Sequence, residues 1–174
     1  FPNYPANRSV HYRIPRAPSA ATNKELTGLG AIGYFVDGVA MFDNRDAFSY
    51  SNSNNADATP QSSYTGDGIW NRDAYVNESV TFDAGNAHQA GSNYHYHANP
   101  PALRYPIGAH VNYDPFTNTY TENPVDLTHS PSIGSLRDRY PIYVPYTYDD
   151  PNDAPRPLPR MTSVFQTRAR SKAC

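Results

Sequence analysis

Residues 29–43, LGAIGYFVDGVAMFD, carry the clearest folding signal in the chain. Two short apolar runs, 34–36 and 39–42, flank the pair Asp37-Gly38. An Asp-Gly pair between apolar runs is typical of a β-hairpin, and we predict a two-residue turn in which both positions need a positive φ. The stretch therefore predicts a pair of antiparallel strands.

Residues 129–146 form a fainter copy of this hairpin at a constant spacing. The matching positions pair Ile32 with Ile133, Gly33 with Gly134, Asp37 with Asp138, Met41 with Ile142 and Phe42 with Tyr143. The turn differs, because Arg139 occupies the place of Gly38. Since a duplicated hairpin can pair two halves of one fold, we expect a single-domain β-sandwich or barrel-like fold.

Seventeen prolines and 15 tyrosines distinguish the composition of this 174-residue chain. Proline interrupts both helices and central strands, so the regular elements must be short and joined by many turns. The ring of tyrosine can fill a small core while its hydroxyl bonds at the edge. The length suits one domain with a core of its own. We therefore expect an all-β protein, mostly strands and rich in loops.

Changes in composition divide the chain into three parts. Residues 1–28 are expected to form an extended N-terminal segment, and residues 29–148 the β domain. Residues 149–174 are expected to form a proline- and arginine-rich C-terminal tail, which is basic.

Weaker patterns predict four local elements. Alternation at residues 10–14 predicts an edge strand. The polar stretch 43–68 predicts a long loop. A short helix is expected over residues 71–77, followed by a strand that ends near Asp83.

Several classes of protein are excluded or disfavoured. The net charge of −2, without a basic stripe interleaved with aromatic residues, argues against nucleic-acid binding. No apolar run approaches the length of a membrane span. Residues 28–33 match the letters of GxGxxG, but they lead into a hairpin rather than a helix, so dinucleotide binding is rejected.

The stretch Asn93-Tyr94-His95-Tyr96-His97 is the part of the sequence that carries chemistry. In a strand, alternate side chains share a face. His95 and His97 would therefore project together, and Tyr94 and Tyr96 would point the other way, into the core. A pair of imidazoles on a rigid strand suits zinc, copper, iron or nickel.

Three further residues are candidates to complete or support a metal site. His88 lies seven positions before His95, across a glycine-containing turn that could bring it back. His129 precedes the second hairpin, and Asp83 could ligate a metal or orient a histidine. Two alternatives remain open from the residues alone: a hydrogen-bonded structural cluster of His and Tyr, and a catalytic histidine that needs no metal.

Taken together, these motifs resemble the YHYH-domain family, which is named after the stretch around His95. The shared features are Gly30-Ala31-Ile32-Gly33 with the turn Asp37-Gly38-Val39, Asp83 and Ala87-His88 ahead of the motif, then His129-Ser130, Ile133-Gly134 and Pro141-Ile142-Tyr143. The match covers roughly residues 10–146. It departs at Arg139, where the family has the glycine of Asp-Gly, and at Ala87, where the family usually has glycine. The resemblance implies a secreted or periplasmic protein and leaves its activity open.

We therefore expect a secreted, periplasmic or cell-surface protein that binds a metal through His88, His95, His97 and His129. Copper is expected first and zinc next, and a metalloenzyme of redox or hydrolytic type would follow. A calcium site at Asp43, Asn44 and Asp46 is a weaker expectation, since these residues lack EF-hand spacing.

Alternative functions rest on the polar and aromatic composition. One is a structural or adhesive module that assembles with other copies of itself outside the cell. Another is a module that binds extracellular polysaccharide through exposed tyrosines; the candidates are Tyr50, Tyr64, Tyr146 and Tyr148. The sequons at Asn7 and Asn77 match chance expectation and leave glycosylation undecided.

Overall fold

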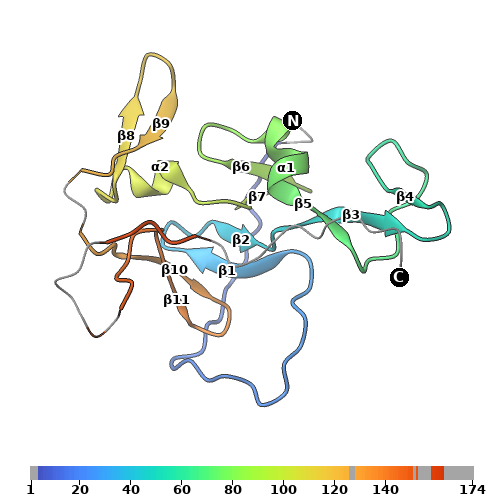
Figure 1. The fold of residues 1–174 in the computed structure, drawn as a ribbon, viewed down its shortest axis with the longest axis horizontal. Coiled ribbons are helices and arrows are strands. Elements are labelled where there is room, and N and C mark those ends of the chain that lie inside the picture. The colour runs from blue at the N-terminus through green and yellow to red at the C-terminus, as the bar shows by residue number, and fades with distance from the viewer. Residues whose placement is uncertain (1–3, 126–127, 151, 153–157, 163–174) are drawn as a thin grey trace.

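The computed structural model describes residues 4–125, 128–150, 152 and 158–162. A six-stranded sheet forms the centre of the molecule, and smaller sheets and short helices lie around it (Figure 1). In sheet order, the six strands are β11 (Pro141–Tyr143), β10 (Ser132–Leu136), β1 (Ala31–Phe35), β2 (Ala40–Phe42), β7 (Asn93–Tyr96) and β6 (Ala87–Ala90). The expected all-β, loop-rich class is confirmed, whereas the strands in the described ranges close no barrel.

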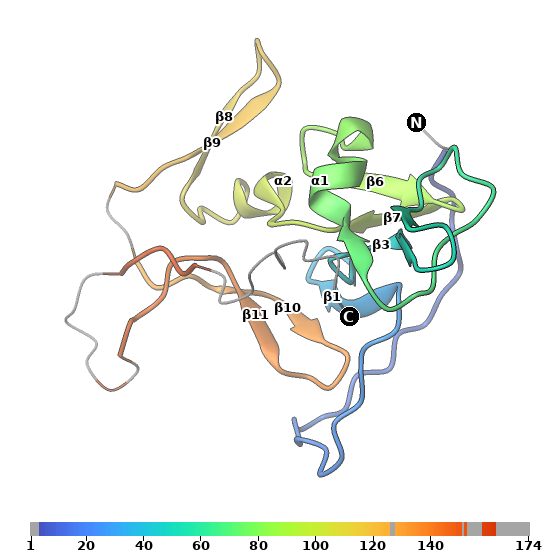
Figure 2. The same cartoon turned by 45° about the vertical axis from the view of Figure 1, so that its right-hand side comes forward.

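The remaining elements extend outward from this sheet. Two smaller sheets comprise β4 (Ala56–Asp57), β3 (Arg45–Ser51) and β5 (Asn71–Asp73) in one, and β8 (Val111–Asp114) and β9 (Thr119–Glu122) in the other. The helical elements are α1 (Ala74–Glu78), the 3-10 turn η1 (Ser79–Thr81) and α2 (Pro101–Arg104). The β8–β9 hairpin stands away from the rest of the molecule (Figures 1 and 2). Among the described residues, no helix is long and apolar enough to cross a membrane.

The β1–β2 hairpin closes through a three-residue loop. The N–H of Gly38 donates to the carbonyl of Phe35, and the N–H of Phe35 donates to the carbonyl of Val39, both at 2.9 Å. Within the loop only Gly38 has a positive φ, 84°. This is a type I turn followed by a left-handed residue, so the predicted two-residue turn is wrong. The Asp37 carboxylate accepts the N–H of Val39 at 3.0 Å and supports the turn that forms instead.

The β10–β11 hairpin repeats the same loop. The N–H of Arg139 donates to the carbonyl of Leu136 at 2.8 Å, and the N–H of Leu136 donates to the carbonyl of Tyr140 at 2.9 Å. Arg139 takes the left-handed conformation that Gly38 takes in the first copy, with a φ of 73°. The predicted duplication is therefore confirmed, including the turn where the residue type changed.

Strands β1 and β10 join the two hairpins about an approximate two-fold axis. The pairs are Gly33 with Leu136, Tyr34 with Ser135 and Phe35 with Gly134, a register that is unchanged when the copies are exchanged. A Cβ on Gly33 would lie 2.9 Å from the Ser135 carbonyl oxygen, and one on Gly134 would lie 2.6 Å from that of Tyr34. Both Ile-Gly steps are therefore glycine because the strand backbones approach too closely for a side chain.

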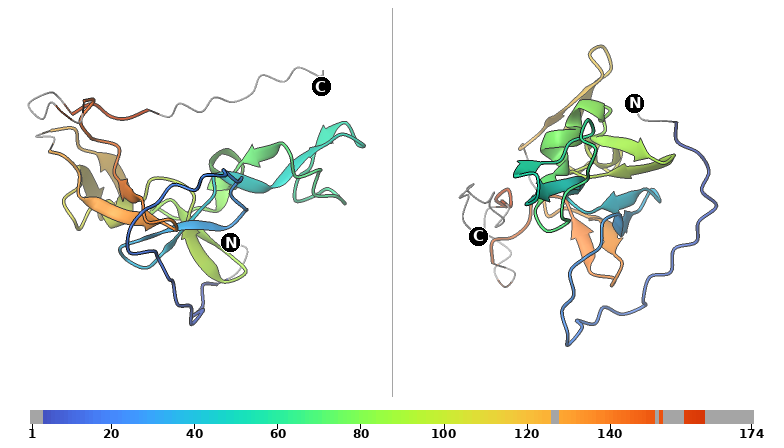
Figure 3. Two further views of the ribbon diagram at one scale, coloured as in Figure 1. Left: turned by 90° about the horizontal axis from the view of Figure 1, so that it is seen from below. Right: turned by 90° about the vertical axis from the view of Figure 1, so that its right-hand side faces the viewer.

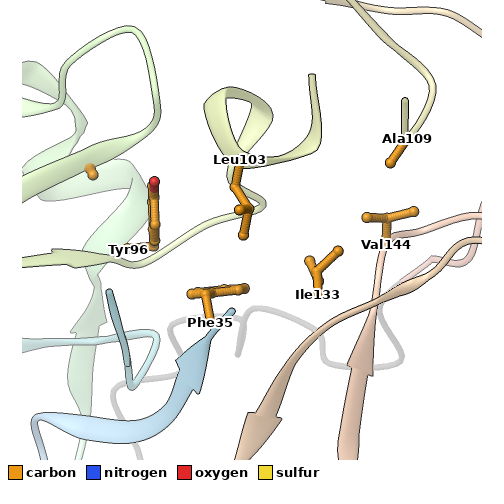
Figure 4. Close-up of a cluster of buried hydrophobic side chains, with 7 residues drawn as sticks. Phe35, Tyr96, Leu103, Ala109, Ile133 and Val144 are labelled. Atoms are coloured by element: carbon orange, nitrogen blue, oxygen red, sulfur yellow. The ribbon is translucent and has the colours of Figure 1, made fainter. Parts of the chain in front are cut away.

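One apolar cluster connects both hairpins to β7 and α2 (Figure 4). Its buried members are Phe35, Ala87, Tyr96, Leu103, Ala109, Ile133 and Val144. Tyr96 meets Phe35 edge to face, with ring centroids 5.2 Å apart. Tyr94 is partly buried against the same cluster. Both tyrosines of the motif therefore point into the core, as the alternation predicted, and the histidines between and after them point to the other face.

The N-terminal segment forms no strand at residues 10–14, contrary to expectation. It runs around the outside of the molecule (Figure 3) and is held by isolated contacts instead of a ladder, among them the N–H of Ala6, which donates to the carbonyl of Ser92 at 3.0 Å. The Tyr12 ring stacks on that of Tyr34 at 3.6 Å, and Arg8 donates to the carbonyl of Gly91 at 2.9 Å. Prolines on either side of the segment limit continuous pairing.

Three other local expectations are corrected or shifted. The stretch 43–68 contains β3 and β4 rather than a loop alone, because Tyr50 and Ser51 pair with Asp57 and Ala56, and Asn54 bonds the Ser51 hydroxyl at the turn between them. The helix expected at 71–77 is α1, which Asp73 caps by accepting the N–H of Val76 at 2.9 Å. The strand expected to end near Asp83 is instead η1.

Most of the expected C-terminal tail lies outside the described residues. Within the described part, Arg160 forms an isolated bridge with Tyr146. The division into three parts stays a prediction.

Candidate metal centre

The β6–β7 hairpin sets the first two histidines opposite one another. Gly91 and Ser92 both have a positive φ, 54° and 64°, which makes a two-residue turn that matches the twist of paired strands. In the resulting register His88 pairs directly with His95. The glycine-containing turn therefore brings His88 back to the motif, as the spacing suggested.

His97 joins this pair from the residue just beyond β7. It shares a face with His95, and their Nε2 atoms lie 3.0 Å apart. One ring nitrogen of each of His88, His95 and His97 lies within 4.8 Å of those of the other two. All three side chains are almost fully buried, with His95 only 1% exposed. The structure thus gathers three histidines at one point.

Backbone carbonyls fix the tautomers of His95 and His97. The Nδ1 atom of His95 lies 2.8 Å from the carbonyl oxygen of Asn93, and that of His97 lies 2.8 Å from the carbonyl oxygen of Asp43. A carbonyl only accepts, so each Nδ1 must carry the proton. The facing Nε2 atoms of the neutral rings are then both bare lone pairs.

A hydroxyl fixes the tautomer of His88 in the same way. Thr81 Oγ1 donates its single hydrogen to the carbonyl of Glu78 at 2.7 Å, so it accepts from His88 Nδ1, also at 2.7 Å. The Nε2 atom of His88 is buried and makes no hydrogen bond within the described residues. Three imidazole lone pairs therefore converge, each oriented by a bond at the opposite nitrogen, which is the usual arrangement of metal-binding histidines.

A carboxylate from the end of α1 lies beside this cluster. Glu78 Oε2 is 3.0 Å from His88 Nε2 and 3.4 Å from His97 Nε2. Burial of the carboxyl opposes ionisation, whereas hydrogen bonds and charge from protonated His88 and His97 would hold the pKa of Glu78 well below its usual range. Glu78 could not be predicted from the sequence, because a residue at a helix end meets a β-hairpin only through tertiary packing and no spacing rule signals it.

Two phenylalanines shield the imidazoles from water. The Phe42 ring lies 3.7 Å from that of His95 and nearly parallel to it. Phe82 lies parallel to His97 and meets the edge of His88, with centroids 6.1 Å and 5.0 Å away. Burial lowers the pKa of His95 to about 4, so this ring is neutral at pH 7. The centre therefore offers neutral nitrogen donors in an apolar surrounding.

A family model described as YHYH protein matches residues 11–173. The chain belongs to the YHYH family. The match covers more of the chain than the motifs identified in the sequence, which ended near residue 146. No curated protein and no solved structure is detectably similar to the chain. The motif that names the family supplies two of the three converging histidines.

The fourth histidine expected at the centre of this YHYH protein lies elsewhere. His129 Nε2 contacts Thr147 Oγ1 at 3.2 Å, and its ring packs between those of Tyr143 and Tyr148. His129 precedes β10, which is three strands from β7, or about 14 Å at the usual strand spacing. Separation across the sheet therefore keeps His129 away from the other three.

Asp83 supports the YHYH motif through a tyrosine and not through a histidine. Its carboxylate accepts the hydroxyl of Tyr94 and the N–H groups of Gly85 and Ala87. Burial, with the Asp83 bond next, raises the pKa of Tyr94 far above its usual range. Asp83 thus stabilises the turn that leads into β6, and it bonds the Tyr94 hydroxyl on the face of β7 opposite the histidines.

The residues considered for calcium form ion pairs instead. Asp43 pairs with Arg45 at 2.6 Å, and Asp46 pairs with Arg72 at 3.1 Å. Carboxylates that face arginines have less capacity to hold a hard cation. These pairs do not favour calcium binding, which stays an untested prediction.

Proposed function

We propose that the protein binds one zinc or copper ion through Nε2 of His88, His95 and His97. The observation that carries the proposal is the convergence of three bare Nε2 lone pairs whose opposite nitrogens are all committed to hydrogen bonds. Lone pairs 3.0 Å apart in a buried site repel unless a cation lies between them. Zinc bonds imidazole nitrogen at about 2.0–2.1 Å, which places two ligands of a tetrahedral ion about 3.3 Å apart.

Without a metal, a protonated histidine could supply the positive charge that the cluster needs. A hydrogen bond from His95 to His97 would require an imidazolium, because both Nδ1 atoms already hold their protons. Burial lowers the pKa of His95 to about 4, which disfavours that form at neutral pH. An imidazolium of His88 paired with Glu78 at 3.0 Å is the metal-free arrangement that the distances allow, and elemental analysis distinguishes it from a bound metal. A metal satisfies all these atoms at once.

The donor set restricts the metal. Imidazole suits zinc and copper, and no thiolate or thioether is among the converging atoms. Zinc would supply Lewis acidity, whereas copper would supply redox chemistry. Both metals therefore stay in the proposal.

A structural or adhesive module is the second candidate function. The observation in its favour is the protruding β8–β9 hairpin, whose tip residue Phe116 is 97% exposed (Figure 2). In this reading the metal would serve stability, as in other proteins whose metal binding is coupled to folding. The proposed location is secreted, periplasmic or cell-surface, for which the composition and the family resemblance are the support.

Elemental analysis of the natively purified chain tests the metal proposal. We expect about one zinc or copper ion per chain, lost in the His95→Ala/His97→Ala variant. His129→Ala is the matched control, because it removes a histidine outside the centre and should keep the metal. The single variant His88→Gln should also lose the metal, which guards against a folding failure of the double variant. Equal metal content in all four proteins would overturn the proposal.

A further inference from the structure

We infer that Glu78 is a fourth metal ligand, so that the centre is a closed set of three imidazoles and one carboxylate. This inference rests on the proposed function and goes further, because it names the residue that completes the coordination. It also predicts the geometry of the bound ion.

The position of the carboxylate oxygen fits a vertex of the coordination shell. Glu78 Oε2 lies 3.0 Å from His88 Nε2 and 3.4 Å from His97 Nε2. Neighbouring ligands of a tetrahedral zinc ion are about 3.3 Å apart when the metal–ligand bonds are about 2.0–2.1 Å. The two separations lie on either side of that value. A carboxylate that lay near the histidines without binding the metal would not need to be at the spacing of zinc ligands.

The charges at the site also require a cation between these groups. An ionised carboxylate offers only lone pairs, and so does each Nε2 in the tautomer that its Nδ1 bond imposes. Two acceptors that face each other at 3.0 Å gain nothing without a proton or a metal. In the described part of the chain, no lysine or arginine forms an ion pair with Glu78. The side chain of Glu78 also hydrogen-bonds that of Asp46, which is a second acid, so of these neighbours the histidine cluster is the one that can compensate its charge.

The backbone holds Glu78 in this position independently of any metal. Helix α1 is capped by Asp73, and the N–H of Ala74 donates to the carbonyl of Asn44 at 2.8 Å. The carbonyl of Glu78 accepts the Thr81 hydroxyl that in turn accepts from His88. Glu78 is therefore linked to His88 twice, by its main chain through the Thr81 hydroxyl and directly by its side chain. A short helix fixed at both ends places the carboxylate before the metal arrives.

A four-ligand set leaves no open coordination position. Structural zinc sites are closed in this way, whereas catalytic sites keep one position for water or substrate. The side chain of Glu78 is 24% exposed, which makes it the part of the ligand set in contact with solvent. The inference therefore assigns the centre a stabilising role in which Glu78 excludes water from the ion.

The test compares Glu78→Gln and Glu78→Asp with wild type, using Glu25→Gln as an exposed control of the same chemical change. Zinc affinity is measured by competition with a chelator, and coordination number by the visible absorption of the cobalt-substituted protein. We expect both Glu78 variants to lose more than about 100-fold in affinity, beyond the 10–100-fold typical of residues that only support a ligand. Asp keeps the charge but is one methylene shorter, so a purely electrostatic role would let it rescue binding.

The cobalt spectrum separates the possible outcomes. A four-coordinate spectrum in wild type and in Glu25→Gln that changes to a higher coordination number in Glu78→Gln supports the inference. An unchanged four-coordinate spectrum in Glu78→Gln, with a loss of affinity within about 100-fold, overturns it and leaves the histidine centre standing. Failure of the wild type itself to bind zinc or cobalt would overturn the proposed function as well.

Discussion

At the scale of single residues, the proposed metal binding depends on Nδ1 of each histidine, the ring nitrogen that would not contact the metal. The Nδ1 atoms of His95 and His97 donate to backbone carbonyls, and that of His88 donates to a threonine hydroxyl. A backbone carbonyl only accepts, and the Thr81 hydroxyl has already given its hydrogen to the Glu78 carbonyl, so each ring is held in one tautomer and one orientation. Such fixed rings lose little conformational freedom on binding, which favours metal affinity.

The buried state of His95 predicts how the metal-free protein responds to acid. Burial lowers the pKa of His95 to about 4, whereas an unfolded histidine titrates near about 6.5. The unfolded state therefore binds more protons between these values, and the stability of the metal-free chain should fall as pH decreases from about 6.5 to about 4. The expected loss is of order 1–3 kcal/mol, measured by urea denaturation.

The control for this pH dependence is His95→Gln, which removes the titrating ring. Its stability should fall less steeply with decreasing pH over the same interval. Parallel pH profiles for the variant and the wild type would show that His95 is not the group responsible.

At the scale of elements, a single residue explains why the two copies of the hairpin end differently. In the first copy, Ala40 of β2 lies opposite Tyr34 of β1 in a non-hydrogen-bonded pair. The backbone N–H of Ala40 therefore points away from β1, toward β7. In the second copy Pro141 holds the equivalent place, opposite Ser135. Proline has no N–H to donate, so β11 can end the sheet while β2 continues it. The motif strand therefore docks on one copy alone.

This difference predicts a loss of metal binding from a substitution outside the ligand set. Ala40→Pro should weaken the docking of β7 on β2 and lower zinc affinity by at least about 10-fold, as changes in the support of ligands do. Chelator competition measures the affinity, and circular dichroism checks that the chain still folds. The matched control Pro141→Ala should bind zinc as the wild type does. Unchanged affinity in a folded Ala40→Pro protein would contradict this view of the sheet.

At the scale of the whole molecule, the centre connects helix α1 to the end of the central sheet formed by β2, β7 and β6. His97 bonds the end of β2 through the carbonyl of Asp43, and Glu78 belongs to α1. The apolar cluster lies on the other face of β7, around Phe35 and Tyr96. A bound metal would therefore stabilise the histidine face of β7, which the apolar cluster does not cover.

Metal removal should therefore lower the thermal stability of the entire chain. An ion present at about 100 times its Kd adds about 2.7 kcal/mol, which corresponds to a rise in Tm of roughly 5–10 °C for a chain of this size. Calorimetry with and without a chelator measures the difference. The His95→Ala/His97→Ala variant should show no such shift. A wild-type Tm that ignores the chelator would argue against a stabilising centre.

The features predicted correctly from the sequence are those set by neighbouring residues, namely the hairpins and the alternation of side chains along a strand. The turn residues and apolar runs predicted both hairpins, and strand alternation placed Tyr96 in the core and His95 on the opposite face. Contacts set by tertiary packing cannot be predicted from such local patterns, which is why Glu78 was missed and His129 was expected at the metal centre. Strand β3 was read as a loop, since its serine-rich sequence lacks the apolar alternation that marks a half-buried strand.

The tautomeric state of each histidine, read from two-bond proton–nitrogen NMR correlations before and after zinc is added, tests the proposed metal centre. We expect His88, His95 and His97 all to carry their proton on Nδ1 in the metal-free chain. On addition of zinc their Nε2 signals should shift, while those of His129 stay in place. A proton on Nε2 of any of the three at neutral pH, or Nε2 signals that ignore zinc, would contradict it.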